Sequence, residues 1–182
     1  PFAPGERWEA SAAAGAPPWT PEDVALAGDA AFVWIGLRGG DHALELYDGV
    51  AAGSQTPRGV VTRQTDETTV PVVAAGSRGD RVFALRQSVA VSVFRRIPCV
   101  FAYDPLEAGQ GEELAPVWHH DMGVRINGAT LIASDRSGEL VAAAVWDDSR
   151  AVTRVDLLSG DDGALVGRAE FPSIGLSGLD VL

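Results

Sequence analysis

The sequence predicts an all-β fold built from four-stranded antiparallel sheets, and three observations support this prediction. The stretch from Gly128 to Phe171 divides into four short apolar and β-branched runs separated by clusters of Asp, Ser and Gly, which is typical of a meander of strands. A similar order of runs occurs twice earlier in the chain. One sheet alone leaves an apolar face uncovered, so each sheet needs a neighbour. The predicted strands of the stretch are 129–133, 140–146, 151–157 and 165–171.

The repeated unit begins with an apolar strand that is followed by a turn ending in Gly and an acidic residue. The predicted leading strands are 24–27, 70–75 and 129–133, and their turns end at Gly28-Asp29, Gly79-Asp80 and Gly138-Glu139. The second strands are 31–37, 82–85 and 140–146. Each third strand ends at an aspartate, Asp48, Asp104 or Asp156, whose side chain we expect to cap the next turn. The more polar fourth strands are 59–63, 114–119 and 165–171.

Four strands per unit, with apolar inner strands and polar outer ones, are the pattern of β-propeller blades. The predicted organisation is a Pro- and Ala-rich arm over 1–22 and a propeller segment over 23–182, with blades at about 23–66, 67–123 and 124–172 and a further or closing strand within 173–182. Propellers usually need 4 to 8 blades to close, so three blades predict a partial propeller. Residues 85–98 alternate apolar and polar residues between two strands of the second unit, which predicts an elongated hairpin.

Composition limits the classes of partner. Fourteen basic residues against twenty-five acidic ones give a net charge of −11, which disfavours nucleic acid and anionic lipid surfaces. No apolar run approaches the roughly 20 residues of a membrane-spanning helix. Cys99, the single cysteine, lies in an apolar run and is expected to be a buried thiol without a disulfide.

Residues that could carry chemistry are few, and each has a simpler structural interpretation. His42 follows Gly39-Gly40-Asp41 and is expected in a solvated loop, while the glycine-rich run 36–40 lacks the residues of a phosphate loop and predicts a hairpin turn. His119 and His120 should point to opposite faces of a strand, so only His119 could share a metal ion with Asp121. The remaining aspartates lack the spacing of a calcium loop and are expected in turns: Asp135, Asp147, Asp148, Asp156, Asp161 and Asp162.

Two segments, 100–123 and 152–172, resemble the repeat of quinoprotein-like (PQQ-like) β-propellers. In that repeat a strand ends in Asp, a Gly-containing turn follows, and the next strand bears Trp. Here the first segment has Ala102, Tyr103, Asp104, Gly109 or Gly111, and Trp118, and the second has Val155, Asp156, Ser159, Gly160 and Gly167, with longer turns and no second Trp. The resemblance implies a propeller fold, and lactonase-like and WD-type propellers are close rivals.

These observations give no positive support for catalysis, and we predict no catalytic, cofactor-binding or metal-binding residue. The favoured hypothesis is a non-catalytic propeller scaffold for protein–protein interaction in a larger assembly, located outside the cytoplasm, either periplasmic or extracellular. Its partner is another protein or further blades of the same protein, which would bury the first and last sheets. The alternative is part of a propeller enzyme, a quinoprotein-type oxidoreductase or a lactonase-type hydrolase, whose active residues lie in other blades.

Overall fold

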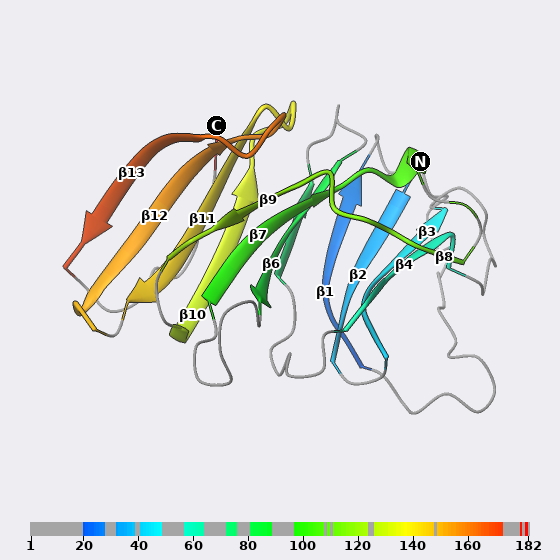
Figure 1. Cartoon of the computed structure of the whole chain (residues 1–182), viewed down its shortest axis with the longest axis horizontal. Coiled ribbons are helices and arrows are strands. Elements are labelled where there is room, and N and C mark those ends of the chain that lie inside the picture. The colour runs from blue at the N-terminus through cyan, green and yellow to red at the C-terminus, as the bar shows by residue number, and fades with distance from the viewer. Residues whose placement is uncertain are drawn as a thin grey trace, which may run out of the picture.

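A computed structural model describes residues 20–27, 32–38, 41–48, 57–63, 72–75, 81–88, 97–107, 109, 111–123, 126–147, 149–172, 179 and 181. In this part of the chain the fold is all-β, as the sequence predicts, and its only helical element is the 3-10 turn η1 (Pro105–Glu107). The strands form three sheets (Figure 1). The first contains β1 (Thr20–Ala27), β2 (Phe32–Arg38), β3 (His42–Asp48), β4 (Gly59–Thr62) and β8 (Glu112–Glu113). The second contains β5 (Val72–Ala75), β6 (Val82–Ser88), β7 (Ile97–Tyr103) and β9 (Trp118–Asp121). The third contains β10 (Ile126–Ser134), β11 (Leu140–Asp147), β12 (Val152–Ser159) and β13 (Leu165–Phe171).

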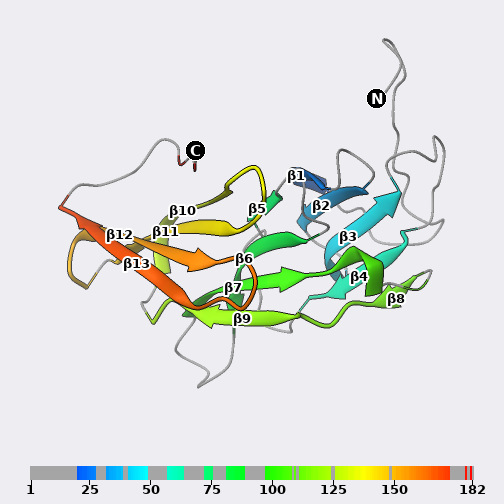
Figure 2. The ribbon, with the colours of Figure 1, turned by 90° about the horizontal axis from the view of Figure 1, so that it is seen from above.

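Each sheet is an antiparallel meander that runs from an inner strand outward, which confirms the predicted blade-like architecture. The inner strand of the second sheet, β5, lies between β1 and β10. Figure 2 shows these three inner strands along one side of the molecule and the outer strands along the other. The three sheets are therefore stacked side by side in chain order, with the second sheet between the first and the third.

Several predicted boundaries are wrong, and the differences have physical reasons. The first strand starts at Thr20 rather than residue 24, so residues 20–22 pair within the first sheet. Pro21 is tolerated because β1 is an edge strand with a bulge beside it. The outer strand of the second sheet is Trp118–Asp121 rather than 114–119. Residues 1–19 and the tip of the predicted hairpin at 89–96 lie outside the described residues. The two arms of that hairpin pair as far as Ser88 and Ile97.

The segment before β9 completes the first sheet instead of the second. β8 pairs in parallel with β4, and the N–H of Leu114 donates to the carbonyl of Val60 at 2.8 Å. The carboxylate of Glu113 accepts hydrogen bonds from both the N–H and the hydroxyl of Thr62. Leu114 is buried in the core between the first and second sheets, so this segment joins the two sheets.

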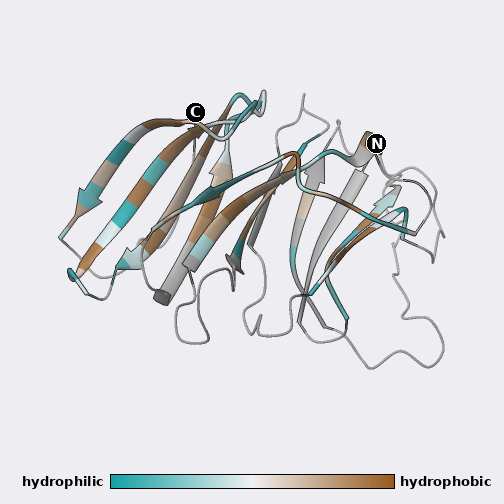
Figure 3. Ribbon diagram, in the orientation of Figure 1, coloured by the Kyte–Doolittle hydropathy of each residue, from teal (hydrophilic) through white to brown (hydrophobic). Residues whose placement is uncertain are grey.

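Successive side chains of β6 and β7 point to opposite faces of the second sheet and belong to two separate cores. One set of residues, which includes Val82, Ala84 and Phe101, packs against the first sheet. The residues between them, which include Phe83 and Val100, pack against the third sheet. In the third sheet, Figure 3 shows alternating hydrophobic and hydrophilic bands along β12. The second sheet is thus covered on both faces by the rest of the chain.

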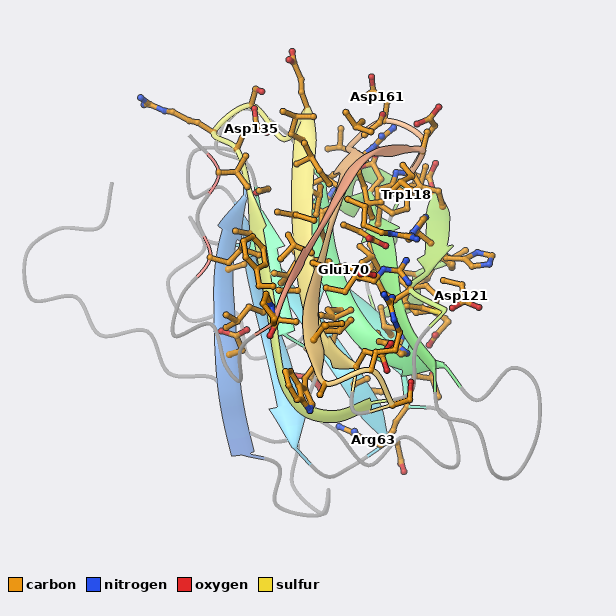
Figure 4. All side chains as sticks on the ribbon, turned by 90° about the vertical axis from the view of Figure 1, so that its left-hand side faces the viewer. Arg63, Trp118, Asp121, Asp135, Asp161 and Glu170 are labelled. Atoms are coloured by element: carbon orange, nitrogen blue, oxygen red, sulfur yellow. The ribbon has the colours of Figure 1, made fainter. Side chains whose placement is uncertain are left out.

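Trp118 of the second sheet contacts the third sheet and stabilises their packing. Its indole N–H donates to the carbonyl of Gly160 at 3.0 Å, in the turn between β12 and β13. The guanidinium of Arg81 donates to the carbonyls of Gly160 and Asp161 at 2.9 and 2.8 Å. Gly163 has a φ of 71°, and a Cβ there would lie 2.5 Å from the Trp118 ring. Figure 4 shows Trp118 and Asp161 close together at this end of the third sheet.

Candidate interaction surface

The third sheet presents a second face that is turned away from the second sheet. Val141, Ala143 and Leu158 belong to the core shared with the second sheet, so the residues alternating with them lie on the opposite side. We call this opposite side the distal face. Strand pairing assigns to it Leu131, Ala133, Ala142, Ala144, Trp146, Thr153, Val155, Leu157, Gly167, Ala169 and Phe171. In Figure 2 no strand of the described chain lies beside it.

The distal face is uncharged and unevenly covered, because Ala142, Ala144 and Thr153 are buried, at 4%, 2% and 4% exposed. Among its larger side chains, Leu131, Trp146, Val155 and Leu157 are half-buried. Phe171 is 43% exposed. In the second sheet, the corresponding faces of β6 and β7 are fully buried on both sides. An apolar sheet face of this kind is one that proteins usually cover.

The outer strand β13 forms the edge of the third sheet and carries two exposed apolar residues outside the distal face. Leu165 and Val166 on this strand are 45% and 58% exposed. The outer edge of the first sheet, in contrast, is paired with β8. No strand of the described residues pairs with the outer edge of β13. Exposed apolar edge strands are typical sites of association.

The first sheet differs, because its face turned away from the second sheet is buried. Leu44 and Leu46 contribute to the core with the second sheet, whereas Ala43, Glu45 and Tyr47 alternate with them and are 0%, 5% and 1% exposed. These residues of the first sheet are therefore buried without another polypeptide. Ala25 on β1 is likewise buried within the chain, between the first and second sheets.

A buried carboxylate, that of Glu45, lies on this face of the first sheet and contacts two other residues of β3. Glu45 accepts a hydrogen bond from the phenol of Tyr47 at 2.5 Å, and its other oxygen lies 2.8 Å from Nδ1 of His42. Burial raises the pKa of Tyr47, and the hydrogen bond and negative charge of Glu45 raise it further. His42 is thus the first residue of β3 and a partner of Glu45, rather than a solvated loop residue.

The predicted histidine cluster is divided between two environments, as strand alternation requires. His119 is exposed, and its ring lies 5.9 Å from that of Phe101. Asp121 accepts the N–H of Gly123 at 2.6 Å. His120 points to the third sheet instead, where its Nε2 lies 3.5 Å from Asp156. The structure therefore brings together His120 and Asp156, a pairing that sequence spacing did not reveal.

Asp156 is not a turn cap, which corrects the sequence prediction. It lies within β12, is fully buried, and accepts two hydrogen bonds from each of two guanidinium groups. The distances are 2.9 and 2.6 Å to Arg154, and 2.7 and 3.1 Å to Arg168. Burial acts to raise the pKa of Asp156, but the hydrogen bonds and charges of Arg154 and Arg168 outweigh burial and hold the pKa below its ordinary value.

Other aspartates occupy the turns in which they were predicted. Asp104 accepts the N–H of Leu106 at 2.9 Å, Asp147 accepts that of Ser149 at 3.0 Å, and Asp162 accepts that of Ala164 at 3.0 Å. Asp135 accepts the hydroxyl of Ser137 and the N–H of Leu140. Burial acts to raise the pKa of Asp135, but these hydrogen bonds outweigh it and lower the pKa. Asp161 is exposed, and Asp148 and the side chain of Asp48 lie outside the described residues.

Three further predictions concern single features. Cys99 is buried, as expected. Residues 36–38 belong to β2, which pairs antiparallel with β3, so the glycine-rich run leads into a hairpin. Leu179 and Val181, the described residues of the predicted closing strand, are not in a strand.

Within the described part of the chain, no group of three potential metal ligands is found, and no helix is long and apolar enough to cross a membrane. Comparison with known protein families and with curated proteins gives no match.

Proposed function

We propose that this chain is a non-catalytic propeller-type scaffold that assembles with another polypeptide through the distal face of its third sheet. The observation that carries the proposal is the difference between the sheets. Strands β6 and β7 of the second sheet and Ala43, Glu45 and Tyr47 of the first sheet are buried. On the distal face Ala142, Ala144 and Thr153 are also buried, but Trp146, Val155 and Leu157 are half-buried and Phe171 is exposed. Covering these side chains would stabilise an assembly by roughly 25 cal/mol for each Å² of apolar surface removed from water.

The polar groups of the chain support a structural role. The carboxylate of Asp156 is hydrogen-bonded to Arg154 and Arg168, and the carboxylate of Glu45 is hydrogen-bonded to Tyr47 and His42. The contact between Asp156 and Arg168 joins β12 to β13, whereas the others lie within single strands. These contacts give each buried carboxylate a partner inside the fold.

A hydrophobic dye tests this proposal, with a pair of matched variants. Val155 lies in the middle of the distal face, and Leu106 on η1 is an exposed apolar residue elsewhere. At low protein concentration the parent chain should bind the dye, Val155→Arg should remove most of the binding, and Leu106→Arg should retain it. Absence of dye binding by the parent, or equal loss in both variants, would contradict the proposal.

A further inference from the structure

The outer edges of the three sheets differ in how far they are protected from pairing with a further strand. In the first sheet β8 already pairs with the outer strand β4, and the N–H of Leu114 donates to the carbonyl of Val60 at 2.8 Å. In the second sheet the outer strand β9 is only 4 residues long and contains two histidines and Asp121. A short edge and charged side chains both disfavour pairing. The outer strand β13 of the third sheet is 7 residues long, and no strand of the described residues pairs with its outer side.

A hydrogen bond in the turn between β12 and β13 shows which backbone groups of β13 face this outer side. The N–H of Ser159 donates to the carbonyl of Ala164 at 2.8 Å, so Ser159 points its backbone groups toward β13. Successive residues of an antiparallel strand bond to opposite neighbours, so every second residue before Ser159 on β12 also faces β13. Their partners on β13 are Gly167, Ala169 and Phe171. The N–H and C=O groups of the intervening residues, Arg168 and Glu170, therefore point to the outer side of the sheet.

The charged side chains of β13 already have partners within the chain. Arg168 donates two hydrogen bonds to Asp156, at 2.7 and 3.1 Å. Glu170 accepts two hydrogen bonds from Arg150, at 2.5 and 2.7 Å. The exposed apolar side chains of the strand are those of Leu165, Val166 and Phe171. Because its two charges are neutralised and its other residues are apolar or glycine, β13 lacks the unpaired charge that protects many sheet edges.

We propose that the outer side of β13 binds an extended segment of another protein, which pairs with the backbone groups of Arg168 and Glu170 and adds a strand to the third sheet. The first sheet has the same arrangement within the chain, because β8 adds a parallel strand to the outer side of β4. In such complexes the backbone hydrogen bonds supply affinity, and alternate side chains of the added strand supply specificity. This edge is separate from the distal face, so the site goes beyond the proposed function.

The side chains of β13 define the chemistry of the added segment. Side chains of adjacent strands contact one another when they lie on the same face of a sheet. The segment therefore places apolar side chains beside Ala169 and Phe171 on one face, and polar side chains beside Arg168 and Glu170 on the other. The net charge of −11 attracts a basic segment and repels an acidic one. The expected partner presents an extended, basic segment in which apolar and polar residues alternate.

Binding of a fluorescently labelled peptide to the full chain tests this proposal. The probe is the peptide KTVTVTVK, whose alternating residues favour an extended conformation and whose ends are basic. The parent should bind it, and Glu170→Pro should weaken binding at least about tenfold, because proline removes the N–H that faces the outer side and leaves the bonds to β12 intact. Arg150→Ala is the matched control, because it removes the same ion pair without changing β13, and it should bind like the parent. Thermal melts of both variants check that the fold is retained.

Hydrogen exchange measured by NMR reports on the same backbone groups directly. In the chain without peptide, the amides of Arg168 and Glu170 should exchange much faster than those of Ala169 and Phe171, and the peptide should slow the first pair. The acidic peptide ETVTVTVE should bind more weakly than KTVTVTVK, and equal binding would contradict a basic partner. A parent chain that binds neither peptide, or a Glu170→Pro variant that binds as the parent does, would overturn the proposal. Slow exchange of Arg168 and Glu170 without peptide would also overturn it, because the outer side of β13 would then already be paired.

Discussion

Replacing Asp156 by alanine should lower the free energy of unfolding by about 3–5 kcal/mol, because the change leaves the guanidinium of Arg154 charged and buried. The side chain of Arg154 is only 10% exposed, whereas that of Arg168 is 40% exposed. Arg168 can therefore turn to water, and its lost hydrogen bonds should contribute little. Most of the predicted loss of stability therefore comes from the guanidinium of Arg154, which would remain charged and buried between the second and third sheets.

Urea unfolding at pH 7 measures this loss. With a slope of about 1–3 kcal/mol per M, the midpoint should fall by roughly 1–5 M while the slope is unchanged. Asp104→Ala is the matched control, because it removes a surface turn contact and should lose only about 0.5–2 kcal/mol. Replacing Asp156 by Leu together with Arg154 by Met should recover most of the stability. If Asp156→Ala loses no more than Asp104→Ala, the account of the buried ion cluster is wrong.

The same carboxylate predicts a pH dependence with a definite sign. Because hydrogen bonds and the charges of two guanidinium groups hold the pKa of Asp156 below its ordinary value despite burial, protonation is harder in the folded chain than in the unfolded chain. Its contribution is complete above the unfolded pKa of about 4 and is lost as the pH falls through the lower folded value. The contribution of Asp156 to the free energy of unfolding should therefore be constant between pH 7 and 5 and decrease below about pH 4. The free energy of unfolding of Asp156→Asn should decrease less steeply in the same acid range. Equal acid dependence of parent and variant would refute the assignment.

Three further predictions follow from single contacts. Gly163→Ala should lower stability by about 1–3 kcal/mol in thermal melts, because its Cβ would overlap the Trp118 ring and its backbone is left-handed; an unchanged melt would argue against the docking of Trp118. Leu114→Ala should lower the free energy of unfolding, measured in urea, by about 2–5 kcal/mol, since the side chain is buried between the first and second sheets. A decrease below about 1 kcal/mol would show that Leu114 is not buried there. The pKa of Tyr47 is raised by burial and by Glu45, so its stabilising contribution is complete below the unfolded pKa of about 10 and is lost above it. The absorbance of the Tyr47 tyrosinate is the difference between the alkaline titrations of the parent and of Tyr47→Phe. This difference should appear only when the parent unfolds in alkali, and its appearance in the folded protein would contradict the prediction.

The meander order could be predicted from sequence because strand and turn signals are local. The final strand, Leu165–Phe171, agrees at both ends with its predicted bounds, since turn residues flank a continuous β-forming run. Contacts between sheets depend instead on which residues the packing brings together. The pairing of β8 (Glu112–Glu113) with the first sheet spans about 50 residues of sequence, and nothing local indicates it.

The error at Asp156 had a signal that could have corrected it. Arg154 and Asp156 stand two residues apart in a β-forming run, so they share one face of the strand, and Leu158 places that face in the core. Two opposite charges on a core-facing side predict a buried pair rather than a turn. Arg168 on the next strand could not be assigned to this pair without the register between β12 and β13.

Solvent footprinting of the distal face tests the central claim most directly. Hydroxyl-radical modification of the protein, followed by mass spectrometry, reports the exposure of Trp146, Phe171 and Leu106 in one experiment. In the assembled state, isolated at high concentration or with its native partner bound, modification of Trp146 and Phe171 should fall several-fold relative to the dilute chain, while Leu106, which lies outside the distal face, should be modified equally in both. Unchanged modification of Trp146 and Phe171 in the assembled state would contradict the claim that this face is the interaction surface.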